Sequence, residues 1–202
     1  PGRQDMLRSI PLALTLFRLA LIPAFAWLFH SEMGAGVRLP GLLVLIIAGI
    51  VSDWADGYLA RRLGVVSVVG KLLDPLTDAA FCMAIFVVYA RAELIPWWVV
   101  AVLIGRETAM TLIVRPFCLW RGTVVAARMI GKVKTSFQFG LMITVVVAQL
   151  PEGLPLVLQG LRWLANFLLV PGYFIVLGLS VTSLWYYLVD LRAMLAKERK
   201  EG

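Results

Sequence analysis

Residues 53–78 read DWADGYLARRLGVVSVVGKLLDPLTD, and this stretch joins long apolar runs on either side. It holds four of the chain's twelve acidic residues, Asp53, Asp56, Asp74 and Asp78. An ionisable group at membrane depth costs about 3 kcal/mol, so by default it marks a functional site. On a helix, each aspartate pair (three and four residues apart) projects from one face. We therefore predict two facing carboxylate pairs, whose charge one or two hard divalent cations would neutralise.

The rest of the chain is as apolar as a membrane protein. Hydrophobic residues make up 61% of its 202 residues, and its mean hydropathy is +0.89, which is unlike the composition of soluble domains. Apolar runs near the ~20 residues that cross a hydrocarbon core predict six spans, at residues 10–30, 41–63, 72–91, 96–118, 131–150 and 168–190. We expect an all-α integral membrane protein with six transmembrane helices.

The predicted spans imply a single membrane domain over residues 1–202. Residues 1–9 would be a cytoplasmic N-terminal segment, 10–190 the six-helix bundle and 191–202 a cytoplasmic tail. Residues 151–170 can form either an interfacial amphipathic segment or an early start to the last span.

The net charge of +7 follows the predicted topology and does not require a nucleic-acid partner. With the N-terminus inside, fourteen of the nineteen Lys and Arg residues fall on the inside, and Arg38, Arg91 and Arg162 fall outside. Arg18 and Arg106 lie within spans. This asymmetry follows the positive-inside rule. We therefore expect both termini to be cytoplasmic and the basic surface to face anionic lipid.

Two further groups of charged residues lie in or beside the later spans. Arg106 and Glu107 are adjacent inside the span over 96–118, where we favour a cavity-facing arginine over an ion pair that only supports the bundle. The sequence GKVKT at 131–135 opens the next span. A helix N-terminus with lysines suits a phosphate, although lysines at a span boundary are also ordinary topology signals. Lys132 and Lys134 diverge by about 200° on a regular helix, so we expect one of them to be the direct ligand.

The acidic stretch resembles the CDP-alcohol phosphotransferase family. It matches that family's signature, D-x2-D-G-x2-A-R-x8-G-x3-D-x3-D, at all eight fixed positions. The segments IPLALTLFR at 10–18, IGRE at 104–107 and GKVKT at 131–135 are similar to those of the bacterial phosphatidylglycerophosphate synthases within the family. The resemblance covers residues 10–140, about two thirds of the chain.

The resemblance implies an enzyme of phospholipid biosynthesis that transfers a phosphatidyl group from CDP-diacylglycerol to glycerol 3-phosphate and releases CMP. It implies a multi-pass homodimer in the bacterial inner membrane, with the active site open to the cytoplasm, and two divalent cations, Mg2+ or Mn2+.

The implied site residues fall into three groups. The metal ligands would be Asp53, Asp56, Asp74 and Asp78, and Asp78 would double as the catalytic base. CDP-diacylglycerol would contact Thr15, Gly57, Ala60, Arg61 and Gly70. The candidates for the phosphate of the acceptor are Arg106, Arg115, Lys132 and Lys134.

Several alternatives stay open from the sequence alone. A cardiolipin, phosphatidylserine or phosphatidylinositol-phosphate synthase would keep the aspartates and change the acceptor pocket. An ion or proton transporter also uses intramembrane carboxylates, but it gives no reason for Gly57, Ala60, Arg61 and Gly70 at these spacings. A noncatalytic scaffold gives no reason for the four aspartates.

Overall fold

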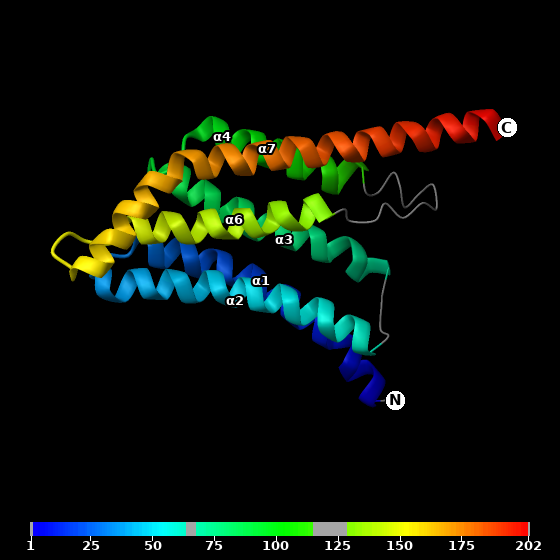
Figure 1. Ribbon diagram of the computed structural model, residues 1–202. Coiled ribbons are helices and arrows are strands. Elements are labelled where there is room, and N and C mark those ends of the chain that lie inside the picture. The colour runs from blue at the N-terminus through cyan, green and yellow to red at the C-terminus, as the bar shows by residue number, and fades with distance from the viewer. Residues whose placement is uncertain (1, 64–67, 115–128, 202) are drawn as a thin grey trace.

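The protein is a bundle of helices that run up and down beside one another (Figure 1). The computed structural model describes the backbone of residues 2–63, 68–114 and 129–201, and the side chains of residues 13, 15–55, 76–112, 130, 131, 133–189, 191 and 192. Its helices are α1 (Gly2–His30), α2 (Ala35–Leu63), α3 (Val68–Arg91), α4 (Trp97–Thr108), the π-helix η1 (Ala109–Val114), α6 (Met129–Ala148) and α7 (Leu156–Glu201).

Short turns connect the helices at one end of the bundle. The turns at residues 31–34, 92–96 and 149–155 lie together there, whereas both chain ends, the end of α2 and the start of α3 lie at the opposite end (Figure 1). Gly153 in the last of these turns has φ +90°, a left-handed conformation that glycine adopts without steric cost. The arrangement agrees with the predicted pattern, in which Arg38, Arg91 and Arg162 share one end.

The core is built around α3, which packs against α1, α4 and α6. Its buried Tyr89 meets Phe25 of α1 edge to face, with ring centroids 5.9 Å apart, a favoured aromatic geometry. The Tyr89 hydroxyl donates a hydrogen bond of 2.9 Å to the Met142 carbonyl of α6. Gly49 of α2 makes room for the ring of Phe81, which lies 2.5 Å from where a Cβ would stand. These contacts fix α3 in the centre of the bundle.

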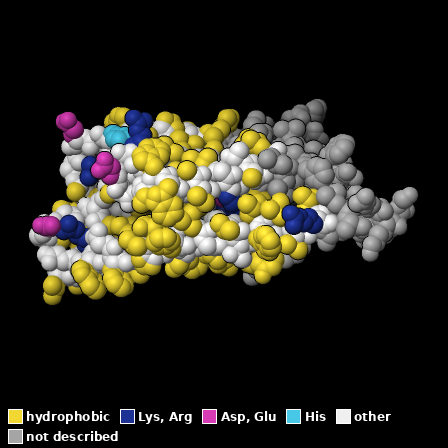
Figure 2. Space-filling view, turned by 90° about the horizontal axis from the view of Figure 1, so that it is seen from above, with side chains coloured by type: hydrophobic (Ala, Val, Ile, Leu, Met, Phe, Trp, Pro, Cys, Tyr) yellow, Lys and Arg dark blue, Asp and Glu magenta, His cyan; other side chains and the backbone are white. Residues whose placement is uncertain are grey.

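Large apolar side chains also cover the outside of the bundle. Leu156 and Trp163 of α7 are 85% and 69% exposed, and Val44 of α2 is 63% exposed. Figure 2 shows hydrophobic side chains spread over the middle of one face, with most of its charged side chains toward one end. A surface of this kind suits hydrocarbon better than water.

Two helices of the described chain are long and apolar enough to cross a membrane, over Ala35–Ala55 in α2 and Leu156–Val189 in α7. Shorter apolar stretches occupy Thr15–His30 and Val133–Ala148. The helical class is therefore confirmed, but the described residues do not confirm six spans.

Several helix bounds differ from those predicted. Helix α2 begins at Ala35 and contains Pro40, and α1 begins at Gly2, so most of the predicted N-terminal segment is helical. Helix α7 is continuous for 46 residues and contains Pro171. It includes most of the segment that the sequence left open and continues through the predicted tail to Glu201. The tail is rich in Ala, Leu, Lys, Glu and Arg, which have high helix propensity.

Candidate active site

Asp53 and Asp78 lie at the same level of the bundle on neighbouring segments of the chain. Asp53 stands ten residues before the end of α2 at Leu63, and Asp78 stands ten residues after the start of α3 at Val68. At the helical rise of about 1.5 Å per residue, both positions are about 15 Å from those helix ends. Because these two distances are equal and the two helix ends lie at the same end of the bundle (Figure 1), the two aspartates lie at the same depth.

Arg18 of α1 connects the two carboxylates. Its Nη1 donates a hydrogen bond to Oδ1 of Asp78, and its Nη2 lies 3.8 Å from Oδ1 of Asp53. Arg18 is buried, while the Asp53 and Asp78 side chains are 47% and 40% exposed. Thr15 is also buried and precedes Arg18 by three residues, on the same face of α1. One guanidinium thus joins three helices, and the two carboxylates keep an accessible side.

The other residues of the signature lie on the same two helices. Asp56, Gly57, Ala60 and Arg61 belong to α2, and Gly70 and Asp74 belong to α3. Their side chains lie outside the described residues. The helical backbone confirms that each aspartate pair is spaced along one helix, as the sequence predicts.

The chemistry of the four acidic residues fits a hard divalent cation. Carboxylate oxygens are the ligands that Mg2+ and Mn2+ prefer, and Asp53 and Asp78 approach each other closely enough to share one guanidinium. The described side chains contain no group of three or more potential metal ligands, since Asp56 and Asp74 are not among them. The metal-ligand roles stay predictions.

A second charged cluster joins α4, α6 and α7. One oxygen of Glu107, Oε2, accepts a hydrogen bond of 3.0 Å from Nη1 of Arg106, and the other, Oε1, accepts one from Nζ of Lys134. Arg106 also donates from Nε to the Ser180 carbonyl at 3.3 Å and from Nη2 to Oγ of Ser183 at 2.8 Å. The side chains of Arg106, Glu107 and Lys134 are 8%, 13% and 6% exposed. This cluster is therefore a buried group in which one carboxylate pairs with two cations.

Two of the four candidate phosphate ligands, Arg106 and Lys134, belong to this cluster. The guanidinium of Arg106 is directed at α7 and Glu107, so the ion pair that the sequence left as an alternative is present. Lys132 and Lys134 both belong to α6, two positions apart. Lys134 is buried, the side chain of Lys132 is outside the described part, and Arg115 lies outside the described residues altogether. Their roles toward an acceptor stay predictions.

Helices of both charged clusters pack against α3. Cys82, a buried free thiol on α3, stands one turn after Asp78. It is within electrostatic range of residues from both clusters, namely Arg18, Asp53, Glu107 and Lys134. Carboxylates outnumber cations in the Arg18 cluster, and cations outnumber carboxylates in the Glu107 cluster.

The π-helix η1 is a feature that the sequence reasoning missed. It begins at Ala109, two residues after Glu107, and π-helical turns occur often at functional sites. No proline or glycine lies within its AMTLIV sequence, so the pattern of residue types gives no signal for it.

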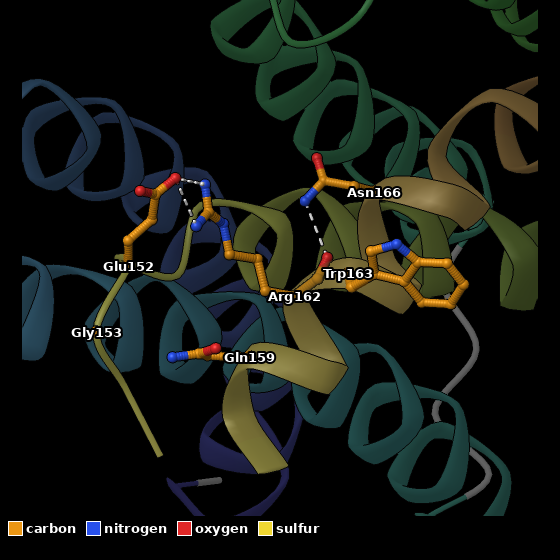
Figure 3. A pocket seen from close by; sticks show the side chains of 6 residues that line it. All are labelled: Glu152, Gly153, Gln159, Arg162, Trp163 and Asn166. Carbon is orange, nitrogen blue, oxygen red and sulfur yellow. Dashed lines mark hydrogen bonds and ion pairs between the residues drawn. The ribbon is translucent and has the colours of Figure 1, made fainter. Parts of the chain in front are cut away.

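A hollow of about 450 Å³ lies at the opposite end of the bundle, at the turn between α6 and α7 (Figure 3). Arg162 in its lining pairs with Glu152 at 3.2 Å, and Asn166 donates to the Arg162 carbonyl at 2.9 Å. The hollow is therefore not part of the candidate site.

Because Glu107 is the carboxylate partner of two buried cations, its loss should destabilise the protein. We expect Glu107→Gln to lower the free energy of unfolding by about 3 kcal/mol, since it leaves a buried charge unpaired. The double variant Glu107→Gln/Lys134→Met removes one charge of each sign and should recover more than half of that loss. Chemical unfolding of the purified variants in detergent measures this coupling. Strictly additive effects would contradict the shared cluster.

Comparison with known proteins agrees with the signature. Residues 8–189 match the CDP-alcohol phosphatidyltransferase family. A CDP-diacylglycerol–glycerol-3-phosphate 3-phosphatidyltransferase of Bacillus subtilis (strain 168) is 36% identical over 190 residues, covering 89% of this chain and 93% of the relative. A cardiolipin synthase (CMP-forming) of Streptomyces coelicolor is 32% identical over 196 residues, covering 94% and 86%. An enzyme of Salmonella typhimurium with the same name as the Bacillus one is 36% identical over 134 residues, covering 64% and 72%. With the family match spanning most of its length, the chain belongs to the CDP-alcohol phosphatidyltransferase family.

Proposed function

We propose that this protein transfers the phosphatidyl group of CDP-diacylglycerol to glycerol 3-phosphate, forming phosphatidylglycerophosphate and CMP in phospholipid biosynthesis. The observation that carries the proposal is the approach of Asp53 and Asp78 to one guanidinium. It supports a shared carboxylate site between the two halves of the family signature. The Bacillus relative, named for this reaction, is similar over 89% of the chain and favours glycerol 3-phosphate as the acceptor.

The proposal includes a place in the membrane. The protein would cross the bacterial inner membrane with six helices, as a homodimer whose active site and termini face the cytoplasm. The two long apolar helices support insertion, and the excess of basic residues toward the end that holds both termini supports this orientation. The exposed apolar side chains of α2 and α7 suit contact with lipid or with a second copy.

The substrate nucleotide and the cations would meet at the carboxylates. The residues that would hold two Mg2+ or Mn2+ ions are Asp53, Asp56, Asp74 and Asp78. When bound, such ions neutralise a diphosphate and clamp the attacking and leaving oxygens. CDP-diacylglycerol would contact Thr15, Gly57, Ala60, Arg61 and Gly70. Glycine and alanine beside carboxylates let a ligand approach the backbone closely.

The reaction requires a deprotonated alcohol in line with the diphosphate. Asp78 would take the proton from the primary hydroxyl of the acceptor, whose oxygen then forms a bond to the β-phosphorus. The bond from that phosphorus to the bridging oxygen breaks, and CMP leaves with the electron pair. Asp78 is 40% exposed, so its accessible side can receive a hydroxyl. Orientation of the two reactants supplies much of the rate.

The phosphate of the acceptor requires cations of its own. The candidates are Arg106, Arg115, Lys132 and Lys134. The burial of Lys134 inside the bundle favours it as the lysine ligand, although Glu107 accepts one of its hydrogen bonds. Arg106 offers a planar fork of donors, but Ser180 and Ser183 already occupy part of it.

A cardiolipin synthase is the second candidate. The Streptomyces relative with that name is similar over 94% of the chain. Such an enzyme would use the same carboxylates and would accept the hydroxyl of phosphatidylglycerol. The family membership argues against the transporter and the scaffold, because neither explains the complete signature.

The experiment that tests the proposal is CMP release by the purified protein in lipid nanodiscs. We expect release from CDP-diacylglycerol with glycerol 3-phosphate as acceptor, its loss in excess chelator, and its return with Mg2+ or Mn2+. Serine, inositol phosphate and phosphatidylglycerol serve as competing acceptors. Full activity in excess chelator would show that the reaction does not require the divalent cations. A preference for phosphatidylglycerol would favour the cardiolipin synthase instead.

Asp78→Asn tests the assignment of the base. If Asp78 accepts the proton, turnover should fall by about 100-fold or more, while CDP-diacylglycerol still binds. Steady-state kinetics and equilibrium binding of the nucleotide lipid measure the two effects separately. Near-normal turnover would assign the base to another group, and loss of nucleotide binding would make Asp78 primarily a ligand.

Lys134→Met tests the acceptor site. It should raise the KM for glycerol 3-phosphate about tenfold or more, because a charged hydrogen bond to one substrate is lost. The KM for CDP-diacylglycerol should change by less than about twofold. The stability-compensated Glu107→Gln/Lys134→Met variant should show the same split, and Arg162→Met at the far end serves as the control. Equal changes in both constants would make Lys134 a support of the bundle.

A further inference from the structure

Arg18 holds the carboxylate atoms that the proposed cations require. Its two terminal nitrogens face Oδ1 of Asp78 and Oδ1 of Asp53. A carboxylate oxygen that bonds a guanidinium has less of its negative charge available to a metal ion, and a divalent ion at the same oxygens repels the guanidinium. The guanidinium of Arg18 and a divalent ion therefore cannot both bind these oxygens at full strength.

We propose that Arg18 is a positioning residue that occupies Asp53 and Asp78 when no cation is bound, and that it competes with the divalent cation for them. The inference rests on the proposed function, because it assumes that the carboxylates bind cations during the reaction. It adds a role for a residue outside the family signature.

The need for such a residue follows from electrostatics. Asp53 and Asp78 repel each other, and part of each side chain is removed from water. Without a positive partner, this repulsion pushes α2 and α3 apart and the carboxylates lose their facing positions. A guanidinium delivered by α1 neutralises both at once, because arginine presents its donors as a planar fork. Lysine offers one ammonium as a point charge and cannot span two carboxylates in the same way.

The same pairing that stabilises the cation-free protein lowers its affinity for the metal ion. The cation must displace the guanidinium, and the free energy of that displacement weakens binding. Arg18 thus stabilises the cation-free protein at the expense of cation affinity. A residue that merely filled space would change stability by the same amount with and without the cation.

The test uses the full chain in nanodiscs, without lipid substrate, and Mn2+ as the probe. Arg18→Met removes the charge and keeps an unbranched side chain, Arg18→Lys keeps one charge, and Arg162→Met removes an ion-paired arginine at the opposite end of the bundle. The electron paramagnetic resonance signal of free Mn2+ gives the dissociation constant. Tryptophan fluorescence gives the unfolding temperature in chelator and in saturating Mn2+.

We expect Arg18→Met to bind Mn2+ about tenfold or more tightly than the unmodified protein, the factor that corresponds to one displaced ion pair of about 1.4 kcal/mol. Its unfolding temperature should fall by several degrees in chelator, and Mn2+ should close most of that gap. Arg18→Lys should show the same changes with a smaller amplitude. If Arg18→Met does not fold, the Arg18→Lys variant alone tests the proposal. Arg162→Met should leave the dissociation constant unchanged.

Weaker or unchanged Mn2+ binding in both Arg18 variants would overturn the competition, as would a stability loss that Mn2+ does not reduce. Absence of Mn2+ binding in the unmodified protein would overturn both this inference and the cation site of the proposed function. Normal Mn2+ competition together with no CMP release would overturn the proposed function and leave the role of Arg18 intact.

Discussion

The pairing of Arg18 with Asp53 and Asp78 is the interaction on which the arrangement of the candidate site depends. Charges within an apolar bundle must be neutralised by partners, and here the partners come from three helices. The guanidinium of α1 therefore determines how α2 and α3 face each other. The matched distances of the two aspartates from the facing helix ends make that pairing possible without a change in helix length.

The residual charge of the two clusters is opposite in sign. Arg18 with Asp53 and Asp78 leaves one formal negative charge, to which Asp56 and Asp74 add two more along the same helices. Arg106, Lys134 and Glu107 leave one formal positive charge. Cations would fit the first cluster and an anionic acceptor the second.

The sequence predicted the helices and the aspartate pairs because both depend on short-range patterns. Apolar runs predict helices, and the spacing of Asp53, Asp56, Asp74 and Asp78 predicts which face each pair shares. The partners of Arg18 depend on packing between helices far apart in the sequence, which no local pattern specifies. An arginine within the apolar run of α1 is nevertheless a signal that a carboxylate must lie at its depth. The π-helix after Glu107 had no comparable signal, since it depends on neighbouring helices and on backbone geometry.

The central claim is that the carboxylates of α2 and α3 form a cation site that Arg18 occupies in the absence of metal. The most direct measurement is a crystal structure of the protein soaked with Mn2+, with anomalous diffraction collected near the manganese edge. The account predicts anomalous density bounded by Asp53, Asp56, Asp74 and Asp78, with the guanidinium of Arg18 moved away from Oδ1 of Asp78. Anomalous density elsewhere, or none while the Arg18 contacts persist at saturating Mn2+, would contradict it.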